Sequence, residues 1–113
     1  MGSISGSSLK AQSKLFGSLG DESRLSILLA MQNGARTVGQ IVATTGLSQS
    51  NVSNHLACLR DCGLVDCEKD GRLVRYWVAV PRLWDLLVGA DEILKDKTQQ
   101  IQACANFEDA HVG

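Results

Sequence analysis

Four segments in the first half of the chain place apolar residues at the spacing of a helix, and a capping or breaking residue flanks each of them. The N-cap types are Asp21, Thr37 and Ser48, and the chain-breaking glycines are Gly20, Gly34, Gly46 and Gly63. The pattern predicts helices over residues 9–19, 22–32, 38–45 and 49–62. The second has apolar residues nearly all round, which is typical of a helix buried in the middle of a small domain.

The pattern changes period after Gly63. Residues 64–69 and 72–80 are rich in strand-forming side chains, and Asp70-Gly71 between them is a typical two-residue hairpin turn. The short Thr44–Leu47 segment has the length and glycine content of a helix-turn-helix connection. A helix-turn-helix followed by a hairpin predicts a winged helix-turn-helix, mainly α with a β-hairpin wing.

A last helix is expected after Pro81, with a broad apolar surface. A domain of this size cannot cover both that surface and the first helix, so we expect a homodimer that forms through the first and last helices. The chain of 113 residues has room for one core. We expect a flexible segment over 1–8, a DNA-binding and dimerisation domain over 9–96, and a polar C-terminal tail over 97–113 that contributes a metal ligand.

Charge and composition exclude some classes. The net charge of -1 is not that of a protein with a basic coat for nucleic acid, so any DNA-binding surface must be local. No apolar run is long enough for a membrane span and no secretory signal is evident, which favours a cytoplasmic protein. In a reducing compartment, the 4 cysteines are better explained as thiols or metal ligands than as disulfides.

The predicted helix over 49–62 has a buried side and a DNA-facing side. Val52, Leu56 and Leu59 form the inward stripe, and small polar side chains lie opposite, where they can reach phosphates and base edges. Basic residues beside the hairpin tip, with Lys69 and Arg60 as further candidates, would neutralise phosphate. The predicted DNA-binding residues are Gln49, Ser50, Ser53, Asn54, His55, Arg72 and Arg75.

The same helix carries Cys58 and Cys62, spaced four residues apart and therefore on one flank. Side chains at this spacing emerge about 5–6 Å apart at Cβ, so two thiolates can hold one ion. A third donor is needed, and Cys104 in the tail is the best candidate, with His55 a weaker one. Thiolate donors favour soft or borderline ions. Cadmium(II) or lead(II) is the expected inducer, with zinc(II) as a further candidate. Cys67 is expected to face inward from the first wing strand, as a packing residue.

Over residues 9–96 the chain resembles the ArsR/SmtB family of winged-helix repressors. The resemblance rests on the stretches Leu19–Leu28, Leu47–Leu56, Leu59–Val65 and Gly71–Tyr76. It implies a homodimer that binds operator DNA without metal and leaves it when metal binds. Within the family, the chain is most similar to the cadmium- and lead-sensing CmtR type, whose metal cysteines correspond to Cys58, Cys62 and Cys104. The arsenic-branch Cys-Val-Cys is absent from Val38–Ala43, and the last helix lacks the histidines of the zinc-sensing type.

Three alternatives remain open. The cysteines could form a redox or persulfide switch in a repressor of the same fold, although a disulfide between positions i and i+4 would distort an intact helix. A thiol enzyme with Cys58 activated by His55 is disfavoured, because the sequence offers no oxyanion loop and no third orienting group. The winged helix could also serve protein contacts alone.

Overall fold

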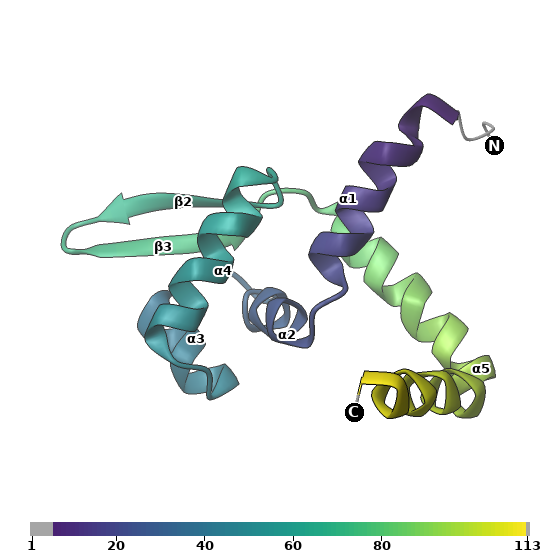
Figure 1. Ribbon diagram of the computed structural model, residues 1–113. Coiled ribbons are helices and arrows are strands. Elements are labelled where there is room, and N and C mark those ends of the chain that lie inside the picture. Colours follow the sequence, from purple (N-terminus) through teal and green to yellow (C-terminus); the bar gives the residue numbers. More distant parts are fainter. Residues whose placement is uncertain (1–5, 113) are drawn as a thin grey trace. The chain divides into compact units, whose positions relative to one another are not determined.

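The computed structural model describes residues 6–112, with the side chains of residue 7 and of 98–112 excepted. The chain divides into two compact units, Met1–Val80 and Pro81–Gly113. After a single 3-10 turn at Gly6–Ser8, the first unit is built from the elements shown in Figure 1. They are α1 (Leu9–Leu19), α2 (Glu22–Ala30), β1 (Arg36–Thr37), α3 (Val38–Thr45), α4 (Gln49–Asp61), β2 (Val65–Asp70) and β3 (Leu73–Val78).

The capping residues act as their sequence positions predicted. The side chains of Asp21, Thr37 and Ser48 each accept a hydrogen bond from the backbone N–H three residues on, and so start α2, α3 and α4. Gly46 ends α3 with φ of 76°, a left-handed conformation that costs glycine little. The four helices and the winged helix-turn-helix fold are therefore confirmed.

The core of the first unit lies where α2, α3 and α4 meet. Of the largest fully buried side chains, two come from α2, one from α3 and three from α4: Ile27, Leu28, Ile41, Val52, Leu56 and Leu59. The last three are the inward stripe predicted for α4. The expectation that α2 is buried all round is wrong at Leu29, which stays 53% exposed, because a helix at the edge of so small a core has one side in solvent.

The wing is a three-stranded antiparallel sheet in the order β1-β3-β2. Its hairpin arms project away from α3 and α4 (Figure 1). The strand β1 was not predicted, since its two residues are too few to show a period. It pairs Arg36 with Tyr76 and Thr37 with Arg75, and Thr37 is also the N-cap of α3. The wing and the helix-turn-helix are thus joined at one residue.

The position of the hairpin turn differs from the prediction by one residue. Asp70 pairs with Leu73, so the two turn residues are Gly71 and Arg72, not Asp70 and Gly71. Gly71 has φ of 64°, whereas no non-glycine residue of the described chain has a positive φ. A positive φ at the first turn position alone is the type II′ pattern, which places glycine first. Arg72 therefore lies at the tip of the wing.

The second unit consists of α5 (Arg82–Val112), in which Lys97 has a non-helical backbone. The helix begins directly after Pro81, as predicted, but residues 98–112 are also helical where a tail was expected. Glutamine, alanine and glutamate in this stretch are good helix formers, which accounts for the difference. Among the described residues, no helix combines the length and apolar character needed to cross a bilayer.

Candidate DNA interface and thiol site

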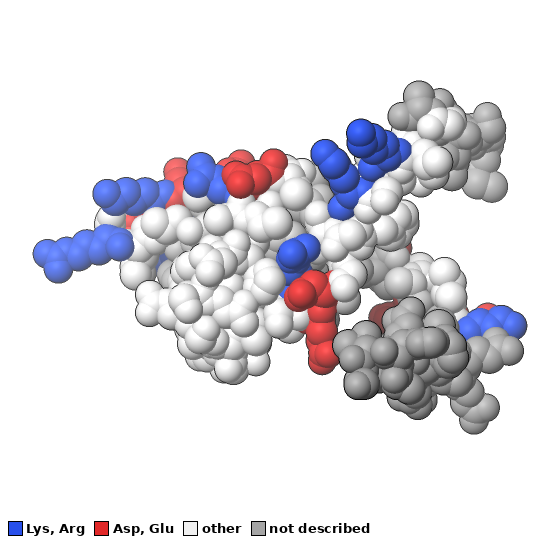
Figure 2. All heavy atoms as spheres, viewed as in Figure 1, with Lys and Arg blue, Asp and Glu red and all other residues white. Residues whose placement is uncertain are grey.

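The first half of α4 presents uncharged polar side chains to solvent. Gln49, Ser50, Ser53 and Asn54 are exposed and lie away from the buried stripe, while His55 is half-buried at the flank. Figure 2 shows the surface over α3 and the first half of α4 as a white area, without acidic or basic side chains. This half of the helix therefore offers hydroxyl, amide and imidazole groups for hydrogen bonding, with no acidic group among them to repel phosphate.

The start of α4 is fixed by its cap. Ser48 Oγ accepts from the backbone N–H of Asn51 at 3.1 Å and lies 3.4 Å from Ser50 Oγ. Ser50 is thus tied to the cap, and Ser53 and Asn54, one turn further along, are the more available polar side chains for a base or phosphate.

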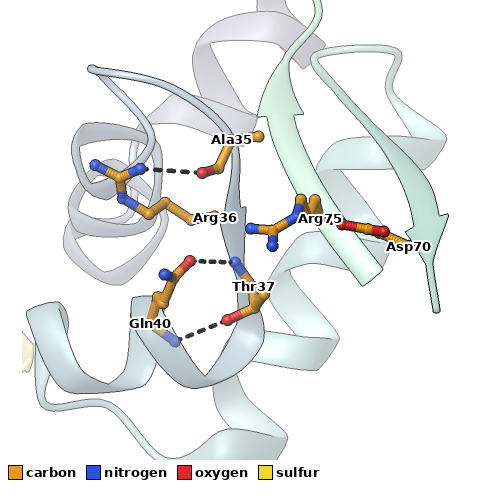
Figure 3. A network of polar contacts seen from close by, with 6 residues as sticks. All are labelled: Ala35, Arg36, Thr37, Gln40, Asp70 and Arg75. Carbon is orange, nitrogen blue, oxygen red and sulfur yellow. Dashed lines mark hydrogen bonds and ion pairs between the residues drawn. The ribbon is translucent and has the colours of Figure 1, made fainter. Parts of the chain in front are cut away.

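The wing carries its positive charge at the tip. Figure 2 shows basic side chains at the end of the hairpin, with acidic ones beside them. Arg72 and Lys69 are exposed, whereas Arg75 Nε donates to Asp70 Oδ2 at 3.0 Å, with the two side chains 41% and 65% exposed. Figure 3 shows Arg75 directed toward Asp70. The two predicted arginines are therefore not equivalent, because only Arg75 is partly neutralised by a carboxylate.

A capping box at the start of α3 went unnoticed in the sequence. Thr37 Oγ1 accepts from Gln40 N at 3.2 Å, and Gln40 Oε1 accepts from Thr37 N at 2.9 Å, as Figure 3 shows. The spacing Thr-x-x-Gln was the available signal. Because Thr37 also pairs with β3, this cap sets the direction of the wing relative to α3 and α4.

The two cysteines of α4 keep the helical spacing that the sequence predicted. The backbone N–H of Cys62, the C-cap residue, donates to Cys58 O at 3.1 Å, so the two residues lie one turn apart. Both are free thiols; Cys58 is half-buried and Cys62 is exposed. Cys67 is a half-buried free thiol on β2 opposite Tyr76, on the wing and not on α4. Soft donors at positions 58 and 62 fit a thiophilic ion.

The thiol of Cys62 contacts α1. Its Sγ lies 3.6 Å from Ser18 Oγ, and Ser18 Oγ also donates to Lys14 O at 3.0 Å. Ser18 is 9% exposed. A pocket of about 230 Å³ lies beside this contact and is lined by Ala11, Lys14, Leu15, Ser18, Cys62 and Leu64. Sequence reasoning missed Ser18, because its partner is 44 residues away along the chain.

His55 is engaged by an arginine and not by a thiol. Arg24 Nε donates to His55 Nδ1 at 3.3 Å. That nitrogen is therefore occupied, and a metal-ligating role for His55 through Nδ1 would require the loss of this hydrogen bond. No hydrogen bond joins His55 to Cys58 in the part of the chain that the structure describes, so the geometry gives the thiol-enzyme alternative no support. The contact between Arg24 and His55 was not predicted from the sequence, although the sequence does place Arg24 three residues after the capping Asp21.

Asp21, the N-cap of α2, is held in its charged form. The pKa of the Asp21 carboxyl is lowered, chiefly by the hydrogen bond from the backbone N–H of Arg24, and the charge of the Arg24 guanidinium acts in the same direction. The charged carboxylate is the better acceptor, so the α2 cap is kept in place at neutral pH.

The third predicted ligand, Cys104, lies outside the residues whose side chains the structure describes. Among the described side chains, no three histidine, cysteine, aspartate or glutamate residues come together closely enough to hold a metal ion. The described part of the site is thus the Cys58 and Cys62 pair, which needs a further donor to hold an ion firmly.

Comparison with known proteins agrees with this fold. The profile of the family "Bacterial regulatory protein, arsR family" matches residues 21–66. The chain is 38% identical over 94 residues to a "Probable mercury resistance operon repressor" of Streptomyces lividans, covering 83% of this chain and 75% of that protein. It is 49% identical over 69 residues to the "HTH-type transcriptional regulator CmtR" of Mycobacterium tuberculosis, covering 61% of this chain and 58% of that one.

A solved structure supports the same assignment. The homodimeric winged helix-turn-helix DNA-binding domain Mb0332 of Mycobacterium bovis superposes with a TM-score of 0.70 and 30% identity, covering 85% of this chain and 95% of that one. The chain therefore belongs to the arsR family of bacterial regulatory proteins and is a DNA-binding transcriptional repressor, not an enzyme.

Proposed function

We propose that this repressor binds operator DNA without metal and releases it when a soft ion, cadmium(II) or lead(II), is bound by Cys58 and Cys62 with Cys104 as the third donor. The observation that carries the proposal is that two free thiols lie one turn apart on α4, the helix whose other half carries the exposed polar residues. The names of two relatives, a mercury resistance operon repressor and CmtR, support metal sensing. Zinc(II) is a weaker candidate for the same thiol donors.

The coupling follows from the stiffness of α4. A helix of 13 residues moves as a unit over its length. Cys62 at its end contacts Ser18 of α1. Coordination of the two thiols and a third donor by one ion places new constraints on Cys62 beside this contact, and any resulting shift of α4 also moves Ser53 and Asn54. A coupling of about 3 kcal/mol changes operator affinity on the order of 100-fold.

The protein acts as a homodimer in this proposal. Large apolar side chains are exposed on α1 (Leu9 at 71%, Phe16 at 54%) and on α5 (Val88 at 57%, Ile93 at 61%). Each of these helices has an apolar face that a second copy would cover, and the M. bovis relative is homodimeric. A dimer also presents two α4 helices to a palindromic operator.

The test uses fluorescence anisotropy of a labelled duplex from the region upstream of the protein's own gene. Cadmium chloride is titrated into the saturated complex of the wild type and of the variants Cys58→Ser, Cys62→Ser, Cys104→Ser and Cys67→Ser. We expect release from wild type and Cys67→Ser, which is the matched control, and retention in the other three. Release at normal cadmium concentrations from Cys58→Ser would refute the proposal.

The same samples distinguish metal sensing from the redox alternative when absorption spectra and the response to oxidant are also recorded. Sulfur-to-metal charge-transfer absorption on addition of cadmium, with no release by oxidant alone, supports metal sensing. Release by oxidant or polysulfide, without that absorption, would assign the cysteines to a redox or persulfide switch.

A further inference from the structure

The side chain of Arg24 is fixed at several points around the junction of α1, α2 and α4. Its Nη1 donates to the carbonyl oxygens of Gly17 at 3.4 Å and Ser18 at 3.3 Å, at the end of α1. With the guanidinium held there, Nε donates to His55 Nδ1 at 3.3 Å. The backbone N–H of Arg24 donates to Asp21 Oδ1 at 3.0 Å, which fixes its main chain at the start of α2. Arg24 is thus anchored independently of the histidine that it contacts.

The chemistry of this pair determines which nitrogen of His55 carries the hydrogen. A guanidinium has only donors, so the ring nitrogen that it contacts must supply a lone pair. In the neutral imidazole the other nitrogen, Nε2, then bears the hydrogen. We propose that Arg24 is the positioning residue that holds His55 in the Nε2–H tautomer, so that α4 presents a hydrogen-bond donor to an acceptor atom of the operator.

The position of His55 gives this donor a specific use. It follows the exposed Ser53 and Asn54 on α4 and is itself half-buried, at the flank of the polar surface. Between Gln49 and His55 the helix has no lysine or arginine. The first half of α4 must therefore rely on uncharged donors. The acceptors available on DNA from the major-groove side are phosphate oxygens, O6 and N7 of guanine, N7 of adenine and O4 of thymine.

The tautomer can be measured directly by ¹⁵N NMR of the imidazole. The variant His111→Asn removes the other histidine of the sequence, so that the remaining signals belong to His55. At a pH where the ring is neutral, we expect an unprotonated Nδ1 and a protonated Nε2. In Arg24→Met, which keeps the aliphatic stem but has no donor, we expect a mixture of tautomers. An Nδ1–H tautomer in the Arg24-containing protein, or no change in Arg24→Met, would overturn the proposal.

The consequence for DNA is tested by a double-mutant cycle on the apo protein. We expect His55→Phe to weaken operator binding about tenfold, and His55→Gln, whose amide donor reaches the position of Nε2, to restore most of it. We expect Arg24→Met to weaken binding several-fold in the wild type and to have no further effect in the His55→Phe background. An equal effect in both backgrounds would show that Arg24 acts only on the fold, and would overturn the proposal. Circular dichroism verifies that each variant is folded.

The acceptor is identified with modified duplexes. A methylphosphonate removes the charge of one phosphate, and 7-deazaguanine or 7-deazaadenine removes one N7 acceptor. 6-Thioguanine and 4-thiothymine replace O6 and O4 with sulfur, which is a poorer acceptor. If the affinities of the His55-containing protein and of His55→Phe become equal on one of these duplexes, the result supports the proposal and identifies the acceptor atom. Persistence of the full difference on every modified duplex would contradict it.

Discussion

The two halves of α4 differ in chemistry and in surroundings. The first half, Gln49–His55, has exposed uncharged polar side chains and is capped by Ser48. The second half carries Cys58, and the C-cap Cys62 contacts Ser18 of α1. Both halves share one buried stripe, so they form a single rigid element. The proposed ligand of the first half is DNA, and that of the second half is a metal ion. Because the side chains of the two halves differ, a substitution in one half should change the affinity for one ligand only. Because the helix is rigid, binding of one ligand should still change the affinity for the other.

Removal of a thiol should have the largest effect, and it should change the metal affinity of the second half without changing DNA binding by the first. We expect Cys62→Ser to lower cadmium affinity on the order of 100-fold, because a hydroxyl is a poor donor for a soft ion. Operator affinity of the apo protein should stay within about twofold of wild type. Competition with a chelator gives the metal affinity and anisotropy gives the DNA affinity. A parallel loss of both would show that the halves are not separable.

Removal of a polar side chain from the first half should weaken DNA binding and leave metal affinity unchanged. We expect Asn54→Ala to weaken operator binding about 10- to 100-fold if its amide reads a base, since one bidentate base contact is worth about 1–3 kcal/mol. Cadmium affinity should be unchanged. The measurement is anisotropy on the operator and on a scrambled duplex, and unaltered discrimination between the two would remove Asn54 from the reading surface.

Ser18 sharpens the comparison because it contacts the second half from another helix. We expect Ser18→Ala to lower cadmium affinity about tenfold, as is typical when a residue that orients a metal ligand is lost. Ser13, which is exposed on the same helix, provides the matched control Ser13→Ala. Apo DNA affinity should change little in either variant. Equal cadmium affinities in Ser18→Ala and Ser13→Ala would show that the 3.6 Å contact with Cys62 does not orient the thiol.

The wing gives the smallest expected effect. Arg72 at the tip should contribute more to DNA affinity than Arg75, which is paired with Asp70. We expect Arg72→Ala to weaken binding several-fold and to reduce the salt dependence by about one counterion, with a smaller loss for Arg75→Ala. Asp70→Asn, which removes the pairing carboxylate, should strengthen binding slightly. The measurement is operator affinity across a series of salt concentrations; a larger loss in Arg75→Ala than in Arg72→Ala would reverse this order.

Local signals account for what the sequence predicted well. Caps such as Asp21 and Ser48, and the apolar spacing of Val52, Leu56 and Leu59, act within one or two turns of a helix and are therefore readable from the chain. The four helices and the spacing of Cys58 and Cys62 followed from such signals. The hairpin turn was displaced by one residue, because Asp-Gly and Gly-Arg are both acceptable turn sequences and only strand register selects between them.

Long-range contacts account for what was missed. Ser18 and Cys62, or Arg24 and His55, meet only because α1 and α2 pack against α4, and nothing in the local sequence marks those pairs. The strand β1 is too short to show alternation and exists because β3 offers it a partner. For the same reason the third thiol remains a prediction, since a residue far along the chain is placed by packing and not by spacing.

The most direct test of the central claim is reciprocal linkage between the two halves of α4. If cadmium lowers operator affinity by some factor, bound operator must lower cadmium affinity by the same factor. Chelator competition on the free protein and on the protein saturated with operator measures this ratio. We expect cadmium affinity to fall on the order of 100-fold when operator is bound, and the fall to be absent in Cys58→Ser. Equal cadmium affinities with and without operator would contradict the claim that one helix serves both ligands.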